Sequence, residues 1–196
     1  MPADPCLYFL KGEELYVGLY VDDVAAWGSE VKVDWLTNEL SKMVELRCLG
    51  RISNFIGISF VHRDDGSVEM NQKSYIREML KEHGMLNSRG VSTTLEPKVK
   101  PIREGINEEP VSSTMYRKAI GSLLHLSNCT RPDIAFSVSF LSQKCTNPTV
   151  SDWRNVQHLM RYLNNSADMS LVFKKGERKL RSYVDADYAN DTKDRR

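Results

Sequence analysis

Several features that mark large classes of protein are missing from this chain of 196 residues. No apolar run reaches the ~18 residues that a membrane-spanning helix needs, and the opening residues MPADPC form neither a basic nor an apolar signal region. The four cysteines lie far apart without a CxxC pair, and the four histidines are equally scattered, which argues against a zinc site. We therefore expect a soluble intracellular protein, cytoplasmic or nuclear, with reduced thiols and no membrane partner.

The chain also lacks a strong excess of charge of either sign. Lys and Arg number 27 and Asp and Glu number 26, so the net charge is +1 and any nucleic-acid surface must be local. The hydrophobic content of 41% and the charged content of 27% are typical of a globular protein with a core. The length allows one full domain or parts of two.

One stretch, residues 15–28, combines strand-forming residues with two adjacent acids. Apolar side chains alternate up to Val21, Asp22 and Asp23 follow, and residues 24–27 form an apolar return strand, so the pattern predicts a β-hairpin. Adjacent carboxylates at a hairpin tip are oxygen ligands of the kind that Mg²⁺ prefers, and such ions assist phosphoryl transfer. The alternative is an Asp-Asp turn that is solvated and has no function.

The remaining patterns predict an α+β fold. The expected elements are strands at 6–10, 15–21 and 24–27, a helix at 30–46, strands at 55–62 and 67–70, a helix at 72–83, three further helices within 115–164, and strands at 170–174 and 180–185. Residues 90–113 have no periodicity and predict a polar linker. Pro132 suits the first position of the second later helix, and Ser151 is expected to cap the third. The fold class is thus an antiparallel hairpin sheet with helices, then a small helical region and a terminal β-hairpin.

Six blocks of residues together carry a resemblance to a known family. Tyr20-Val21-Asp22-Asp23 resembles the YxDD motif of reverse transcriptase palms. Five more blocks follow in the order seen in copia-type retrotransposon Pol polyproteins: NFIGI at 54–58, QKSYI at 72–76, YRKAIGSLLHL with TRPDI at 116–134, RYL at 161–163 and YVDADYAND at 183–191. The match covers nearly the whole chain, which is identified as similar to the C-terminal part of such a reverse transcriptase running into the start of RNase H.

The resemblance implies a role for individual residues. Asp22 and Asp23 match the palm aspartates that bind the catalytic Mg²⁺ (or Mn²⁺), with Asp22 the direct ligand, and Tyr20 and Val21 match positions beside the primer end. Asp185 matches the first metal-binding carboxylate of the RNase H site. Its alternative role is a strand-end aspartate in a solvated turn.

The resemblance also implies a division of the chain and a set of partners. We expect a palm part at 1–90, a linker at 91–114, thumb- or connection-like helices at 115–169 and a truncated RNase H-like start at 170–196. The partners of the full polymerase are an RNA template, a DNA primer and dNTPs. Two-metal polymerisation needs a further aspartate from an upstream strand, and only nineteen residues precede Tyr20. We therefore expect metal binding and activity only with an upstream fingers–palm segment.

Two other functions stay open at this point. The chain could be a noncatalytic module that binds nucleic acid or a protein partner, or a translated remnant without a selected role. Four residues that have no assigned catalytic role are expected to be structural. Arg131 and Asp133 should cap a helix and pair their charges, and Trp35 and Trp153 should lie in the core rather than stack on bases.

Overall fold

A computed structural model describes residues 4–12, 14–96, 109–174, 176 and 182–184. Within these residues the order is β1 (Leu7–Leu10), β2 (Leu15–Tyr20), β3 (Asp23–Trp27), α1 (Glu30–Ser41), β4 (Asn54–Phe55), β5 (Ile58–His62), β6 (Val68–Asn71), α2 (Lys73–Glu82), α3 (Ser113–Cys129), the 3₁₀ turn η1 (Pro132–Ile134), α4 (Ala135–Ser142), α5 (Val150–Asn165) and β7 (Leu171–Phe173). The α+β class predicted from the sequence is confirmed.

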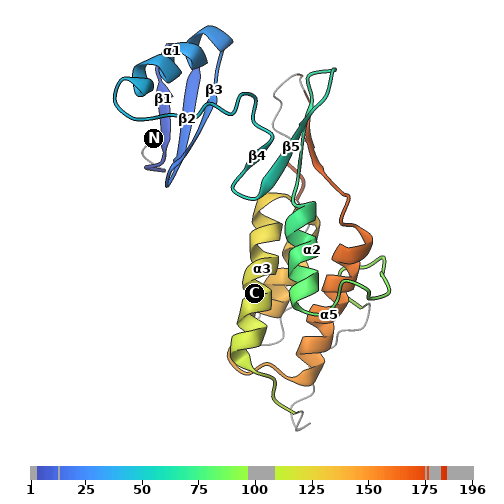
Figure 1. Cartoon of the computed structure of the whole chain (residues 1–196). Helices are drawn as coiled ribbons and strands as arrows, with labels where there is room; N and C mark the ends of the chain where they lie inside the picture. The colour runs from blue at the N-terminus through green and yellow to red at the C-terminus, as the bar shows by residue number, and fades with distance from the viewer. Residues whose placement is uncertain (1–3, 13, 97–108, 175, 177–181, 185–196) are drawn as a thin grey trace.

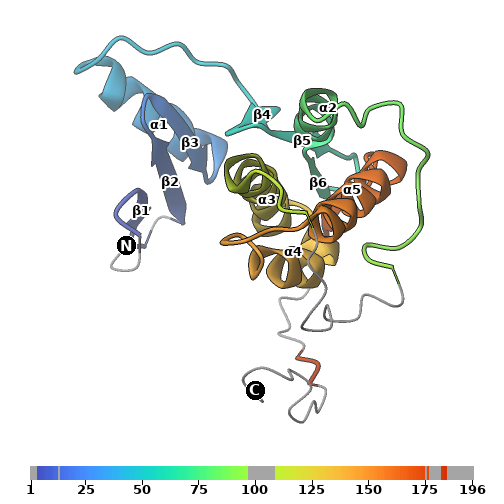
Figure 2. The same cartoon turned by 90° about the horizontal axis from the view of Figure 1, so that it is seen from below.

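The first three strands form an antiparallel sheet in the order β1-β2-β3, as the alternating pattern predicted. Helix α1 lies against one face of this sheet, and the unit stands apart from the rest of the chain (Figures 1 and 2). Helix α1 ends at Ser41, earlier than the predicted end at residue 46. The apolar side chains that suggested the longer helix, Met43 and Val44, are exposed, so no packing surface holds that last turn.

This N-terminal unit has a very small core. Leu15 and Ala25 are the buried apolar residues among those described between 4 and 49. Most of its large apolar side chains are exposed: Leu7, Tyr8, Phe9, Leu10, Tyr16, Leu19, Tyr20, Val21, Val24, Trp27, Val31, Trp35, Met43, Val44 and Leu49. Trp35 was predicted to be a core residue, and this prediction is wrong because α1 contributes no fully buried side chain.

A second antiparallel sheet has the order β4-β5-β6-β7. The single strand predicted at 55–62 is divided in two, because Ile56 and Gly57 have φ of 51° and 73° and form a two-residue hairpin turn between β4 and β5. The last strand, β7, pairs with β6. Of the predicted partner strand at 180–185, residues 182–184 are described and form no strand, and the other three residues lie outside the described part of the chain.

The main core lies among the helices. Side chains of α2, α3, η1, α4 and α5 form one continuous apolar cluster, and Figures 1 and 2 show α2, α3 and α5 side by side. Helix α2 belongs to this cluster through Ile76, Met79 and Leu80. Within the cluster the hydroxyl of Tyr116 donates a hydrogen bond to the Leu141 carbonyl at 2.9 Å, which joins α3 to α4. Trp153 packs against the cluster, as predicted.

The start of α5 differs from its prediction. The N-cap is Thr149, not Ser151: the Thr149 hydroxyl accepts a hydrogen bond from the Asp152 backbone N–H, and the Asp152 carboxylate accepts one from the Thr149 N–H. This reciprocal pair is a capping box. It begins the helix at Val150, directly after the Asn-Pro break.

Arg131 and Asp133 form the charge pair that the sequence predicted. The guanidinium of Arg131 donates to both carboxylate oxygens of Asp133, at 3.0 and 2.8 Å, and to the Ser166 carbonyl and hydroxyl at 3.1 and 2.7 Å. The Tyr162 hydroxyl donates to the same carboxylate at 2.8 Å. These contacts tie the loop after α3 to the end of α5, so the pair is structural.

Candidate metal-binding hairpin

The two adjacent aspartates lie at the end of the β2–β3 hairpin. Tyr20 pairs with Asp23 as the last rung of the ladder, so Val21 and Asp22 are the two loop residues. Val21 has φ of +52°, so the first of the two loop residues has a left-handed backbone conformation, and Asp22 does not have a positive φ. That first loop position usually holds glycine, and a β-branched residue there is strained. Strain of this kind concentrates at functional sites, where the surrounding structure maintains it.

The carboxylates of this hairpin tip are open to solvent. Asp22 and Asp23 are exposed, and within the described part of the chain neither side chain has a hydrogen-bond or ion-pair partner. Val21 is 79% exposed, and Tyr20 is exposed as well. The tip therefore offers two unengaged carboxylates. No group of three or more His, Cys, Asp or Glu side chains in the described residues is placed to hold a metal ion, so these two fit part of a ligand set.

The strands behind the tip are held together by a close contact that sequence reasoning missed. A Cβ on Gly18 would lie 3.3 Å from the ring of Trp27, so the absence of a side chain lets the indole pack directly on β2. Trp27 pairs with Tyr16, and the ring of Tyr16 contacts Phe9 of β1 at 4.6 Å between centroids. A glycine inside a strand often marks such a close approach, and this signal could have identified the contact.

The hollow described in this unit lies at the other end of the hairpin. It has a volume of about 540 Å³ and is lined by Gly12, Glu14, Gly28, Ser29 and Lys32. These residues flank the beginning of β2 and the end of β3, while the aspartates lie at the opposite ends of both strands. The hollow is therefore separate from the carboxylates.

The structure brings four of the predicted site residues together. Tyr20, Val21, Asp22 and Asp23 all lie at the hairpin tip. Asp185, the predicted RNase H carboxylate, lies outside the described residues. Its predicted role remains a prediction.

Residues 5–97 match the reverse transcriptase (RNA-dependent DNA polymerase) family. That segment, which contains the hairpin and α2, belongs to this family. The whole chain is related to the reverse transcriptase region of copia-type retrotransposon Pol polyproteins. It is 31% identical to the Retrovirus-related Pol polyprotein from transposon TNT 1-94 of Nicotiana tabacum, over 99% of this chain. It is also 31% identical to the Retrovirus-related Pol polyprotein from transposon RE2 of Arabidopsis thaliana, over 98% of this chain.

The chain corresponds to only part of these relatives. It spans 15% of the tobacco polyprotein and 13% of the RE2 polyprotein. It spans 75% of an uncharacterized mitochondrial protein from Arabidopsis thaliana, at 28% identity over 93% of this chain. No solved structure matches the chain significantly. No helix in the described part of the chain has the length and apolar content needed to cross a membrane.

Proposed function

We propose that the β2–β3 hairpin is the metal-binding hairpin of a reverse transcriptase palm, and that the chain acts within a copia-type polymerase that copies an RNA template onto a DNA primer. The observation that carries this proposal is the tip itself. Within a segment of the reverse transcriptase family, two exposed carboxylates without partners follow a strained Val21 in a tight turn. A purely structural turn needs neither adjacent acids nor a valine where glycine is favoured.

In this proposal Asp22 and Asp23 are the residues that hold Mg²⁺, or Mn²⁺ in its place. The bound ion supplies charge that neutralises the triphosphate of the incoming dNTP and activates the primer hydroxyl. The contribution of this chain is to keep both carboxylates at the end of a braced hairpin, with Tyr20 and Val21 beside the primer end. Positioning of this kind accounts for much of the rate of phosphoryl transfer.

The proposed site is completed by a segment from elsewhere in the polyprotein. Two carboxylates are too few for Mg²⁺, which releases its water ligands reluctantly, so a further acid must come from an upstream fingers–palm segment. The exposed apolar surface of β1–β3 supports this interaction. Leu7 pairs with Gly18 and Phe9 with Tyr16, so the exposed side chains of Leu7, Phe9 and Tyr16 lie on one face of a unit with almost no core of its own, and such an apolar area marks an interaction site.

The division of the rest of the chain follows from the same proposal. Residues 115–169 form the thumb- or connection-like helices that follow the palm. Residues 170–196 begin an RNase H-like domain with Asp185 as its first carboxylate. Substitution of Asp185 should therefore affect RNA cleavage in the assembled polyprotein and leave primer extension unchanged.

Primer extension tests the proposed function. The full chain is assayed with an RNA template, a DNA primer, dNTPs and Mg²⁺, first alone and then with a fingers–palm fragment of a copia-type Pol polyprotein added. We expect extension only in the mixture, and its loss in Asp22→Asn. Asp64→Asn is the matched control, because Asp64 is an exposed aspartate in the β5–β6 turn. Extension by the mixture that is unaffected by Asp22→Asn would refute the role of the hairpin.

A further inference from the structure

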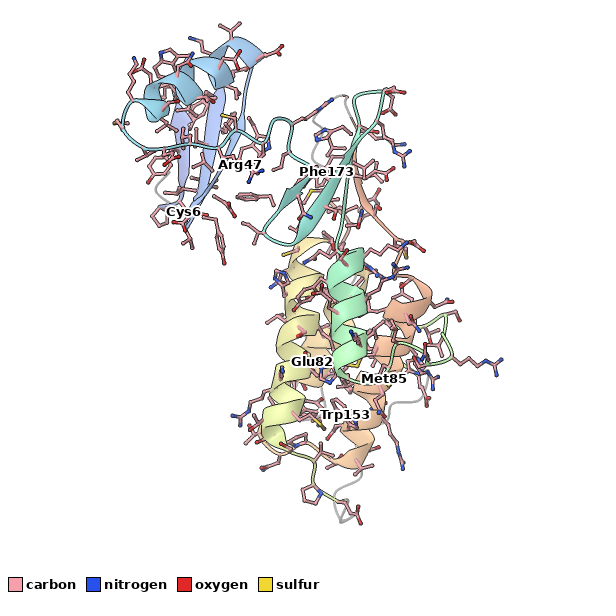
Figure 3. The ribbon with its side chains drawn as sticks, viewed as in Figure 1. Cys6, Arg47, Glu82, Met85, Trp153 and Phe173 are labelled. Carbon is pink, nitrogen blue, oxygen red and sulfur yellow. The ribbon has the colours of Figure 1, made fainter. Side chains whose placement is uncertain are left out.

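The segment that joins α2 to the linker, residues 85–96, is held on the outer face of α5. Met85 packs against the helical core at the end of α2 (Figure 3). The Asn164 side-chain amide then donates hydrogen bonds to the carbonyls of Leu86 and Ser88, at 3.1 and 3.0 Å. This connecting segment (residues 85–96) therefore meets α5 near the end of the helix.

The contacts of the connecting segment continue toward the beginning of α5. A Cβ on Gly90 would lie 2.7 Å from Asn165, and the Thr93 carbonyl oxygen lies 2.9 Å from Nε2 of His158. Asn165 and His158 are about two helical turns apart. The connecting segment therefore passes along the face of α5 that lies between these two residues.

Arg161, the first residue of the RYL block, lies between these two contacts of α5. It is about one turn from His158 and from Asn165, and residues at these spacings share a helix face. The side chain of Arg161 is partly buried, and its Nε atom is enclosed and has no hydrogen-bond partner. Within the described part of the chain, no carboxylate pairs with its guanidinium. Because a guanidinium is always positively charged, Arg161 is a partly desolvated cation without a counter-charge.

Two other arginines lie on the same side of the helical unit. Arg154 precedes Arg161 on α5 by about two turns, so the two residues share a face and their Cα atoms are about 10 Å apart. Arg89 follows Ser88, which is bound to Asn164 one turn beyond Arg161. Arg154 and Arg89 are exposed, and neither has a recorded partner among the residues that the structure describes.

Few acidic side chains offset this positive charge. Oε1 of Glu96 lies 3.5 Å from Nδ1 of His158, and the Glu96 side chain is 67% exposed. The acid of α5 itself is Asp152, and its carboxylate accepts hydrogen bonds from Thr149 in the capping box. The arginines therefore outnumber the acids on this face, and the surface has a local excess of positive charge.

A guanidinium without a counter-charge favours an anion, and its planar N–H groups match the oxygens of a phosphate. Arginines about 10 Å apart on one helix face reach more than one phosphate of a nucleic-acid backbone, whereas a single phosphate ion contacts only one of them. We propose that Arg161, together with Arg154 and Arg89, binds the backbone phosphates of a nucleic acid along the outer face of α5. The choice of nucleic acid as the source of the phosphates rests on the proposed function. Such contacts position a nucleic acid and do not read its sequence.

Fluorescence anisotropy of the full chain with a labelled RNA–DNA duplex tests this surface. The affinity is measured without dNTPs over a series of salt concentrations. We expect Arg161→Gln to weaken binding about three- to tenfold and to lower the slope of log affinity against log salt by about one, the contribution of one phosphate contact. Arg154→Gln should act in the same direction, and because Arg154 is exposed its replacement should leave the fold unaffected. Glu96→Gln should strengthen binding, since it removes a negative charge from the same face.

The matched control is Arg47→Gln, because Arg47 is an exposed arginine of the N-terminal unit (Figure 3). It should leave the affinity and the salt dependence unchanged. Equal losses in Arg47→Gln and Arg161→Gln would overturn the proposal, and so would an absence of duplex binding or duplex binding that both Arg161→Gln and Arg154→Gln leave unchanged.

A second measurement separates the two possible sources of phosphate. Calorimetry of the full chain with inorganic phosphate should show binding much weaker than that of the duplex, because one ion engages one arginine. Binding of inorganic phosphate that depends on Arg161, without binding of the duplex, would show a site for free phosphate and overturn nucleic acid as the ligand. Neither measurement involves primer extension, so its result does not depend on the role of the hairpin.

Discussion

Removal of the Asp133 charge should destabilise the helical part of the chain strongly. Arg131 is 2% exposed and Asp133 is 29% exposed, so Asp133→Asn leaves a buried guanidinium without its counter-charge. Breaking a fully buried pair in this way costs about 3–5 kcal/mol. Because Asp133 is partly exposed and Ser166 still accepts two hydrogen bonds from Arg131, we expect a loss of about 2–3 kcal/mol in the free energy of unfolding.

The assay is urea unfolding followed by far-ultraviolet circular dichroism, which reports on the helices. The control is Glu82→Gln, which breaks the exposed Glu82–Lys118 pair and should change the unfolding midpoint little. The double variant Arg131→Met/Asp133→Asn should be less destabilised than the sum of the two single variants, because it leaves no buried charge. Additive losses, or a small effect of Asp133→Asn alone, would refute the reasoning.

The same variant should change the acid sensitivity of the protein. Partial burial acts to raise the pKa of Asp133, but hydrogen bonds from Arg131 and Tyr162 outweigh this effect and the pKa lies below the usual aspartate value. A lowered folded-state pKa stabilises the protein above the unfolded value of about 3.9, and this contribution is lost as the pH falls through the folded value. The destabilisation by Asp133→Asn should therefore be full at neutral pH and shrink below about pH 3.9.

Two further predictions concern packing. Gly90→Ala should destabilise the chain by about 1–3 kcal/mol, because the new Cβ would overlap Asn165. In Gly121→Ala of α3 the new Cβ meets no atom within 4 Å, so this variant should stabilise the chain by up to about 1 kcal/mol. Equal effects of the two variants in thermal unfolding would contradict this prediction. Amide hydrogen exchange should be slower in α3 and α5 than in β2 and β3, because the apolar cluster lies among the helices and the first sheet buries few apolar side chains. Greater protection of β2 and β3 than of the helices would contradict this prediction.

Local patterns in the sequence were sufficient to predict most elements, because their signals come from residues close together in the chain. The alternation at 15–21 and the adjacent aspartates predicted the hairpin, and its strands end within a residue or two of the expected positions. The elements whose limits differ from the prediction do so because of local features that apolar periodicity does not report. The positive φ at Ile56 divides one predicted strand, and the Thr149–Asp152 capping box replaces the predicted cap at Ser151.

Contacts between distant residues could not be predicted from these patterns. The pairing of β7 with β6, the position of α2 in the helical core and the contact of His158 with Thr93 each join segments far apart in the chain. The hairpin that carries the candidate site was predictable because its signal lies within one short stretch of the chain. Gly18 signals a close approach on β2, but the identity of its partner, Trp27, depends on strand register, which the sequence leaves open.

The location of the bound metal ion tests the role of the hairpin most directly. Mn²⁺, which we propose binds at the hairpin in place of Mg²⁺, broadens nearby amide resonances, so the chain assembled with an upstream fingers–palm fragment is titrated with Mn²⁺ and followed by nuclear magnetic resonance. We expect broadening centred on the amides of Val21, Asp22 and Asp23 in the unmodified chain and in Asp64→Asn, and its loss in Asp22→Asn/Asp23→Asn. Broadening centred on another part of the chain, or unchanged at the hairpin in the double variant, would contradict the assignment of these carboxylates as metal ligands.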